Sequence, residues 1–207
     1  MKKCIITISR QYGSGGRQIG RKLSDELAIP FYDKEVIDLA AKESGLAVDF
    51  IRGQEQQLTQ SLLFSIVTNF TTASSGAFNP NMLSLSDQVY LAEAKAIRDL
   101  ADKGPCVIVG RCADWVLEKN YNVLRVFICA GMEERCKRAV EEYGHKPEGI
   151  QRTVKEIDRQ RARYCQHYCD QAWEDASNYD LCLNSGKLGL DHCVQIIRSA
   201  YREMTME

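Results

Sequence analysis

Residues 4–27 read CIITISRQYGSGGRQIGRKLSDEL, and this stretch decides the fold class of the chain. The apolar, β-branched run at its start predicts a buried strand, and three glycines follow it: Gly13, Gly15 and Gly16. Ile19 and Leu23 then recur at helical spacing. A glycine-rich turn between a strand and a helix lets backbone N–H groups converge on one point, where the helix dipole adds positive character. The stretch therefore predicts a loop that binds phosphate.

The predicted loop departs from the phosphate-binding motif G-x-x-x-x-G-K-[ST] at the lysine. With Gly15 in the second glycine slot, Gly16 takes the place of the lysine and Arg17 follows it. We predict that Arg17 supplies the missing charge, because a guanidinium can hold two phosphate oxygens at once. A glycine turn without a ligand is the alternative interpretation. The residues predicted to hold phosphate are Arg10, Gly13, Ser14, Gly15, Gly16, Arg17 and Gln18.

The composition is that of an ordinary globular protein with small-molecule ligands. The 207 residues include 27 basic and 28 acidic side chains, so the formal net charge is −1. This balance predicts no broad attraction to nucleic acid polymers or to anionic membranes. No apolar run approaches the roughly 20 residues of a membrane span. We therefore expect a cytoplasmic protein, and the sequence predicts no particular oligomeric state.

Nine cysteines are scattered along the chain, which suits free thiols in a reducing compartment. Cys165 and Cys169 place two soft ligands four residues apart. Their spacing matches no common zinc motif, and no second pair follows them. We therefore predict no metal site built from protein side chains, and interpret both cysteines as ordinary helix residues.

Strands and helices are predicted to alternate along the rest of the chain. Apolar runs predict strands at 4–8, 29–32, 106–109, 123–129 and 179–183, and helices are expected after the glycine loop and at about 34–43, 86–103, 133–143, 150–167 and 191–203. Ser86-Asp87 is the expected N-cap of the 86–103 helix. Such alternation predicts an α/β fold, a five-stranded parallel sheet with helices on both faces. Residues 46–86 differ in composition, being rich in Gln, Ser and Thr, and are expected to form an inserted element.

Ligands of such sheets bind beyond the carboxyl ends of the strands. Asp33 follows the second predicted strand, and Arg111 follows the third, with Asp114 three residues later. We predict that all three contact the substrate, Arg111 through a phosphate and the aspartates through a sugar or base. Helix capping by Asp114 and a surface ion pair of Arg111 are the alternatives. The 133–143 helix starts at the same edge, and its Arg135 and Arg138 are predicted to bind the nucleotide phosphates.

A strongly basic segment lies in the predicted helix over 150–167. Spacings of four residues place Lys155, Arg159 and Arg163 on one helical face. Gly144 and Pro147 precede this helix and are positioned as hinges. A solvated basic surface is one interpretation. The other is a mobile lid whose arginines close over a phosphate, and the glycine loop favours it.

These segments together resemble the nucleoside monophosphate kinases, and most closely the cytidylate kinase-like family. The segments that carry the resemblance are ITISRQYGSGGRQIG, IPFYDKEVI, VIVGRCAD, VFICAGMEERCKRA, KEIDRQRARY and NYDLCLNSGKLGLD. The resemblance implies a single kinase domain of the P-loop type, with a core formed by 1–45, 86–143 and 171–207, a helical monophosphate-binding insert at 46–85 and an arginine-rich lid at 144–170. It further implies that Gly13 and Gly15 are P-loop glycines, that Asp33 and Arg111 bind the acceptor, and that Arg161 is a lid arginine. In the family an aspartate usually follows the acceptor arginine, where this chain has Cys112.

The function that the resemblance implies is transfer of the γ-phosphoryl group of ATP, bound with Mg²⁺, to a nucleoside monophosphate, CMP or dCMP first. The catalytic residues would be Arg17, Arg159, Arg161 and Arg163, which would neutralise the charge that develops during transfer. Two alternatives remain open. One is a nucleotide-binding module without turnover, which the missing lysine favours, and the other is a P-loop kinase with a different small acceptor.

Overall fold

The computed structural model describes residues 3–33, 36 and 84–206. These residues form a five-stranded sheet in the order β2-β3-β1-β4-β5, and every strand pairing is parallel. The strands are β1 (Ile5–Arg10), β2 (Phe31–Tyr32), β3 (Val107–Val109), β4 (Val123–Cys129) and β5 (Leu181–Asn184). The predicted parallel α/β sheet is confirmed.

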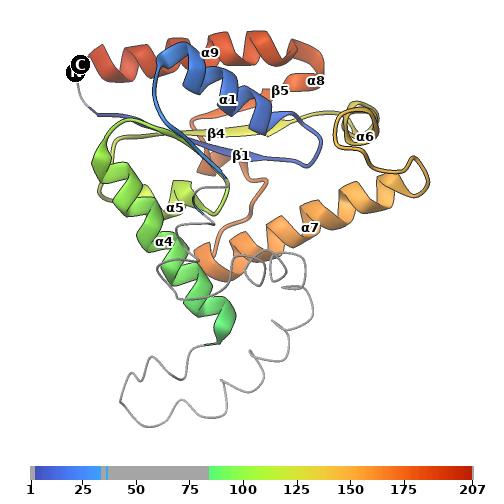
Figure 1. Ribbon diagram of the computed structural model, residues 1–207, viewed down its shortest axis with the longest axis horizontal. Helices are drawn as coiled ribbons and strands as arrows, with labels where there is room; N and C mark the ends of the chain where they lie inside the picture. The colour runs from blue at the N-terminus through green and yellow to red at the C-terminus, as the bar shows by residue number, and fades with distance from the viewer. Residues whose placement is uncertain (1–2, 34–35, 37–83, 207) are drawn as a thin grey trace. The chain divides into compact units, whose positions relative to one another are not determined.

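Helices cover both faces of this sheet (Figure 1). On one face, α1 (Gly16–Leu27) packs against α9 (Leu190–Met206), which follows the short α8 (Ser185–Leu188). On the other face lie α5 (Ala113–Leu117) and α7 (Ile150–Cys169). Helix α6 (Met132–Glu141) follows β4 and packs against α7, and a short 3₁₀ helix spans Ala176–Asn178.

The side chains of β4 show how the two faces are built, because successive residues of a strand point to opposite sides. Val126 and Ile128 belong to the main core, together with Ile19 of α1 and Ile197 of α9. Phe127, between them in sequence, packs instead with Cys165, Cys169, Trp173 and Tyr179. The carboxyl ends of the central strands are therefore fixed between two apolar layers.

Clustering of backbone contacts gives two compact units, one formed by Met1–Asp33 with Ile97–Glu207 and the other by Lys34–Ala96. In the second unit, Ser84 caps α4 (Leu85–Lys103): its Oγ accepts a hydrogen bond from the Asp87 N–H (3.1 Å). The predicted N-cap, Ser86-Asp87, was therefore two residues late. The helix predicted over 34–43, except Val36, and the predicted insert over 46–85, except its last two residues, lie outside the described residues.

The second strand is shorter than predicted, for a local reason. The N–H of Ile29 donates to the Ser24 carbonyl (3.1 Å), so Ile29 still belongs to the end of α1. Pro30 has no N–H, and its carbonyl accepts from Val107 (2.8 Å) as the ladder with β3 begins. None of the helices in the described part of the chain combines the length and the hydrophobicity that a membrane crossing requires.

Candidate functional site

The connection between β1 and α1 is a tight turn with hydrogen bonds between its own residues. Gly13 and Gly15 adopt φ values of +77° and +80°, in the left-handed region that costs other residues about 1–2 kcal/mol. Ser14, between them, is fully buried. Both its N–H (3.2 Å) and its Oγ (2.8 Å) donate to the Gln11 carbonyl. Left-handed glycines in a compact turn are typical of anion-binding backbone nests.

Side chains from other elements fix the orientation of the loop's peptide groups. Arg135 of α6 donates through Nη1 to the Tyr12 carbonyl (3.4 Å), and Ser185 at the start of α8 donates through Oγ to the Ser14 carbonyl (2.5 Å). Across a planar trans peptide, a carbonyl and the N–H of the following residue point in opposite directions. The N–H of the glycine after each of these carbonyls therefore points away from α6 and α8.

The first turn of α1 adds further donors. Its first backbone hydrogen bond runs from the Ile19 N–H to the Gly15 carbonyl (3.0 Å). Among the residues that the structure describes, no acceptor is bonded to the N–H groups of Gly13, Gly15, Gly16, Arg17 and Gln18. These donors lie at the positive end of the helix dipole. The arrangement provides the main-chain part of a phosphate site.

Asp158 of α7 links the loop to two helices, and sequence reasoning gave it no role. Its Oδ1 accepts from the Tyr12 N–H (2.7 Å), and its Oδ2 forms an ion pair with Arg135. Only 12% of the Asp158 side chain and 7% of the Arg135 side chain are exposed. Arg135 was predicted to bind nucleotide phosphates, but its guanidinium is buried against protein groups. Its contacts are those of a residue that positions the loop.

The arginines of the predicted lid divide between two sides of α7. Arg161 donates through Nη1 to the Arg10 carbonyl (2.8 Å), and its guanidinium lies 5.4 Å from the centre of the Tyr12 ring. Arg159 and Arg163 are exposed, and Arg159 pairs with Glu156 three residues earlier. The structure thus brings Arg161 to the loop in its present conformation, and leaves Arg159 and Arg163 at the surface.

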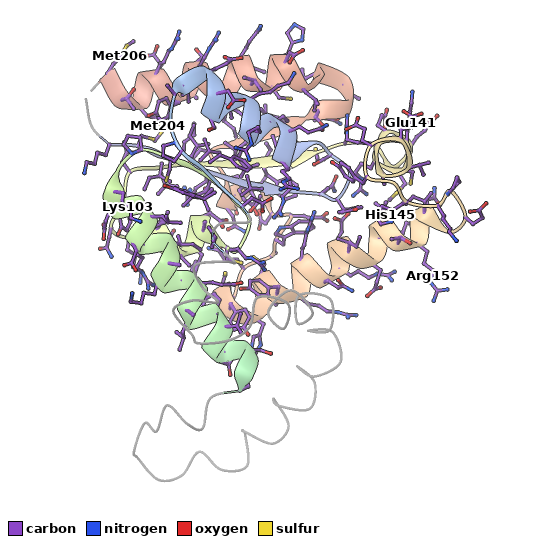
Figure 2. All side chains as sticks on the ribbon, viewed as in Figure 1. Lys103, Glu141, His145, Arg152, Met204 and Met206 are labelled. Atoms are coloured by element: carbon purple, nitrogen blue, oxygen red, sulfur yellow. The ribbon has the colours of Figure 1, made fainter. Side chains whose placement is uncertain are left out.

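The segment between α6 and α7 also contacts the loop. The hydroxyl of Tyr12 lies 2.7 Å from Nε2 of His145, which Figure 2 labels on this segment. The rings of Tyr143 and His145 both meet the Tyr12 ring edge-on. Arg138 of α6 donates through Nη1 to the Gly13 carbonyl (2.6 Å). The loop and the beginning of the predicted lid are therefore in direct contact. No local pattern in the sequence predicts these contacts.

Arg17 and Asp33 form an ion pair, with Nε and Oδ2 2.8 Å apart. Arg17 remains largely exposed at the start of α1. The residue expected to replace the lysine and a residue expected to bind the acceptor are therefore neighbours. Gln18, predicted to hold phosphate, instead donates through its side chain to Glu142.

The turn after β3 brings a second arginine to the same edge. Gly110, Arg111 and Cys112 adopt φ values of +80°, +60° and +51° in succession. Two consecutive non-glycine residues in the left-handed backbone conformation are uncommon, and they imply that contacts around the turn hold it in place. Arg10 is one of those surroundings, because a Cβ at Gly110 would lie 2.1 Å from Arg10 Nη1. Arg10 and Arg111 thus belong to neighbouring carboxyl ends of the sheet.

Asp114 is buried at the beginning of α5. Burial raises the pKa of its carboxyl to about 6, and negative charge on the neighbouring Cys165 sulfur would raise it further. The nearby backbone N–H groups of Asp114 and Trp115 favour the charged carboxylate and oppose that increase in its pKa. The N-cap of α5 is Cys112, whose side chain makes no capping hydrogen bond, so Asp114 is an acidic residue of the first turn rather than the cap of this helix.

Comparison with known proteins agrees with this fold. An uncharacterized protein from Eubacterium ventriosum is 26% identical, with a TM-score of 0.71 over 96% of this chain and 98% of that one. Shikimate kinase from Acinetobacter baumannii, solved in complex with shikimate, has a TM-score of 0.55 at 11% identity over 100% of this chain and 97% of that one. Shikimate kinase from Bacteroides thetaiotaomicron has a TM-score of 0.56 at 10% identity, over 98% of this chain and 99% of that one. At these identities the two shikimate kinases share the fold alone.

No curated protein matches the chain. Residues 5–187 match the cytidylate kinase-like family, a range that begins with β1 and includes the glycine loop, the turn after β3 and all of α7. The chain belongs to the cytidylate kinase-like family and is a nucleoside monophosphate kinase-like phosphotransferase.

Proposed function

We propose that the protein transfers the γ-phosphoryl group of ATP to a nucleoside monophosphate, with CMP or dCMP as the first candidate. The observation that carries the proposal is the set of backbone N–H donors of Gly13, Gly15, Gly16, Arg17 and Gln18. They surround the positive end of α1, where a polyphosphate would be bound by its oxygens. Phosphoryl transfer needs chiefly such positioning and positive charge.

Arg17 takes the place of the P-loop lysine in this proposal. In its ion pair with Asp33, 63% of the Arg17 side chain and 20% of the Asp33 side chain are exposed, so solvent screens the guanidinium, and pairs at the surface contribute only about 0–1 kcal/mol. The guanidinium can therefore exchange the carboxylate for phosphate oxygens at small cost. A bidentate contact with phosphate would then be stronger than the contact that it replaces.

Arg161 is proposed to act on the transferring group from α7. Its guanidinium is at the loop through the Arg10 carbonyl. Arg159 and Arg163, exposed on the same helix, would reach the phosphates only after the lid closes. Arg138 is bonded to the loop at Gly13 and is proposed to contact the donor phosphates, whereas Arg135 acts by holding the loop.

Mg²⁺ would bring charge neutralisation to the donor phosphates, and the phosphates themselves would supply much of its oxygen coordination. The hydroxyl of Ser14, in the glycine loop, is fully buried and donates to the Gln11 carbonyl. A heavily hydrated ion does not fit such a position. Mg²⁺ would therefore enter bound to ATP, and we propose no side-chain ligand for it among the described residues.

The acceptor is proposed from family membership together with three residues. Arg111 would bind the phosphate of the monophosphate, and Asp33 would orient its sugar or base. Asp114 would contribute from the first turn of α5, where its carboxylate is buried. The segment proposed to select the base, residues 46–85, lies almost wholly outside the described residues.

A second candidate function is nucleotide binding without turnover. It is favoured by Gly16 in the lysine position and by the engagement of Arg17 with Asp33. The two functions differ in whether an acceptor makes the protein consume ATP.

The test is an assay of ADP formation with ATP and Mg²⁺, run with each common ribo- and deoxyribonucleoside monophosphate. The kinase proposal predicts ADP formation that depends on the acceptor, with the highest kcat/KM for CMP or dCMP. Binding of a non-hydrolysable ATP analogue is measured in parallel by calorimetry. Tight binding with no acceptor-dependent ADP would replace the kinase by the binding module, and turnover with another acceptor alone would refute CMP.

A further inference from the structure

Three cysteines from two distant parts of the chain meet beneath the candidate site. Cys112 lies in the turn after β3, and Cys165 and Cys169 lie in the last turns of α7. Their Sγ atoms are all within 4.8 Å of one another. The residues are 9%, 5% and 1% exposed.

The backbone holds this triangle in place from both sides. Cys165 and Cys169 are four residues apart and therefore point from the same face of α7. Cys112 adopts the left-handed conformation, with φ +51°, at the N-terminus of α5. A left-handed non-glycine residue is maintained only where its surroundings determine it. In this turn, that conformation directs the cysteine to the pair on α7.

The spacing of the sulfurs fits a metal ion with soft ligands. Thiolates at about 2.3 Å from one tetrahedral ion are about 3.8 Å apart, so the present triangle needs to contract by at most about 1 Å. The apolar neighbours Phe127, Trp173 and Tyr179 form its surroundings. A disulfide would instead join two sulfurs at about 2.05 Å and leave the third thiol unused.

We propose that Cys112, Cys165 and Cys169 bind one thiophilic metal ion, Zn²⁺ or Cu⁺. Binding releases the three thiol protons to solvent and forms three metal–sulfur bonds, with no change of oxidation state. Cu⁺ is satisfied by three thiolates, whereas Zn²⁺ takes a fourth ligand, for which water suffices. The ion ties the end of the arginine-bearing helix to the turn that carries Arg111. This site is independent of the proposed acceptor.

The experiment uses the full chain, purified with reductant and stripped of metal. Titration with Co²⁺ is followed by the thiolate-to-cobalt absorption in the near ultraviolet, and Zn²⁺ is then added to displace Co²⁺. A parallel anaerobic titration with Cu⁺ against a chromophoric chelator tests the second ion. We expect one ion per chain, with the tighter of the two ions identifying the natural occupant.

Variants separate this site from the other thiols. Cys165→Ala and Cys169→Ala each remove one of three metal–sulfur bonds, so the cobalt absorption falls by about a third and the affinity falls at least tenfold. The matched control is Cys182→Ala, which removes an exposed thiol of β5 and leaves both values unchanged. Equal binding by Cys165→Ala and Cys182→Ala would overturn the proposal.

A second measurement keeps the test decisive if a variant fails to fold. An ion that binds the folded chain raises the melting temperature of the unaltered protein, and a chelator reverses the increase. No thiolate-to-cobalt absorption and no such increase with either ion would overturn the proposal. So would a disulfide between any two of the three cysteines in protein isolated without reductant, because that bond removes two ligands.

Discussion

The guanidinium Nε of Arg17 lies 2.8 Å from the carboxylate Oδ2 of Asp33, and this contact joins the first turn of α1 to the residue after β2. The Arg17 side chain is 63% exposed and that of Asp33 is 20% exposed. Because solvent screens the exposed guanidinium, the pair adds only modestly to stability. The effect of the pair is to hold the positive charge of Arg17 near the N–H groups of the glycine loop.

Arg17→Ala is expected to lower kcat roughly 10²- to 10³-fold while raising the dissociation constant of ATP only a few-fold. The reason is that negative charge on the transferring group is greatest in the transition state, so a lost positive charge affects rate more than ground-state binding. Steady-state kinetics and calorimetry measure the two quantities separately.

Lys22→Ala is the matched control for Arg17→Ala. Lys22 lies on the same helix and forms a surface ion pair with Asp191. Its loss removes the same charge without approaching the loop, and kcat should stay within about twofold. Equal effects of the two substitutions on kcat would show that Arg17 does not act on the phosphates.

Asp158→Asn is expected to lower the free energy of unfolding by roughly 3–5 kcal/mol, because it leaves the buried Arg135 guanidinium without its counter-charge. The amide oxygen can still accept from the Tyr12 N–H, but more weakly than the carboxylate does. Urea denaturation measures the change. The neighbouring Arg159→Ala breaks only the exposed pair with Glu156 and should change stability by less than about 1 kcal/mol. A small effect of Asp158→Asn would mean that this pair is not structural.

Arg161→Ala is expected to lower kcat/KM at least tenfold, about 1.4 kcal/mol of transition-state stabilisation. Arg161 is bonded to the loop at the Arg10 carbonyl and lies over Tyr12, so its removal takes positive charge from the site. Lys155→Ala removes the same charge from the exposed face of α7. Measured at two salt concentrations, Lys155→Ala should have a small effect that salt abolishes. If the two substitutions lowered kcat/KM equally and salt abolished both effects, Arg161 would act by general electrostatic attraction of the nucleotide rather than by direct contact with it.

The sequence was sufficient for the sheet and the loop, for physical reasons that are local. A buried parallel strand must be continuously apolar, and this condition identified all five strands to within two or three residues at each end. Three glycines between a strand and a helix have few explanations other than a turn with left-handed residues, and Gly13 and Gly15 adopt that conformation. The N-cap at Ser84 was missed because Ser84 and Ser86 offer nearly the same local signal.

The support of the loop could not be predicted, because its contacts join residues far apart in the chain. Asp158 contacts Tyr12 across 146 positions, and Ser185 contacts Ser14 across 171. An aspartate inside a basic helix resembles a partner in surface ion pairs, and nothing local shows that it is buried. The contact of Cys112 with the two cysteines of α7 could not be predicted for the same reason, since only the fold brings them together.

Gly13→Ala and Gly149→Ala form a pair that separates conformational strain from close packing. Both glycines have left-handed backbones, with φ +77° and +72°. An alanine at either position therefore costs about 1–2 kcal/mol of backbone strain. At Gly149, no described heavy atom lies within 4 Å of the added Cβ, whereas at Gly13 it would lie 2.4 Å from the Arg135 carbonyl oxygen.

The Arg135 carbonyl is part of the α6 backbone and cannot move aside as a flexible side chain can. Gly13→Ala should therefore lower the free energy of unfolding by a further 1–3 kcal/mol or so beyond the loss in Gly149→Ala. It should also weaken ATP binding at least tenfold, because separating the loop from α6 breaks the contacts that orient its N–H groups. Urea denaturation and calorimetry measure the two effects. If both variants lost the same stability and bound ATP equally, the loop would not depend on its contact with α6, and the orientation of its N–H groups would need another cause.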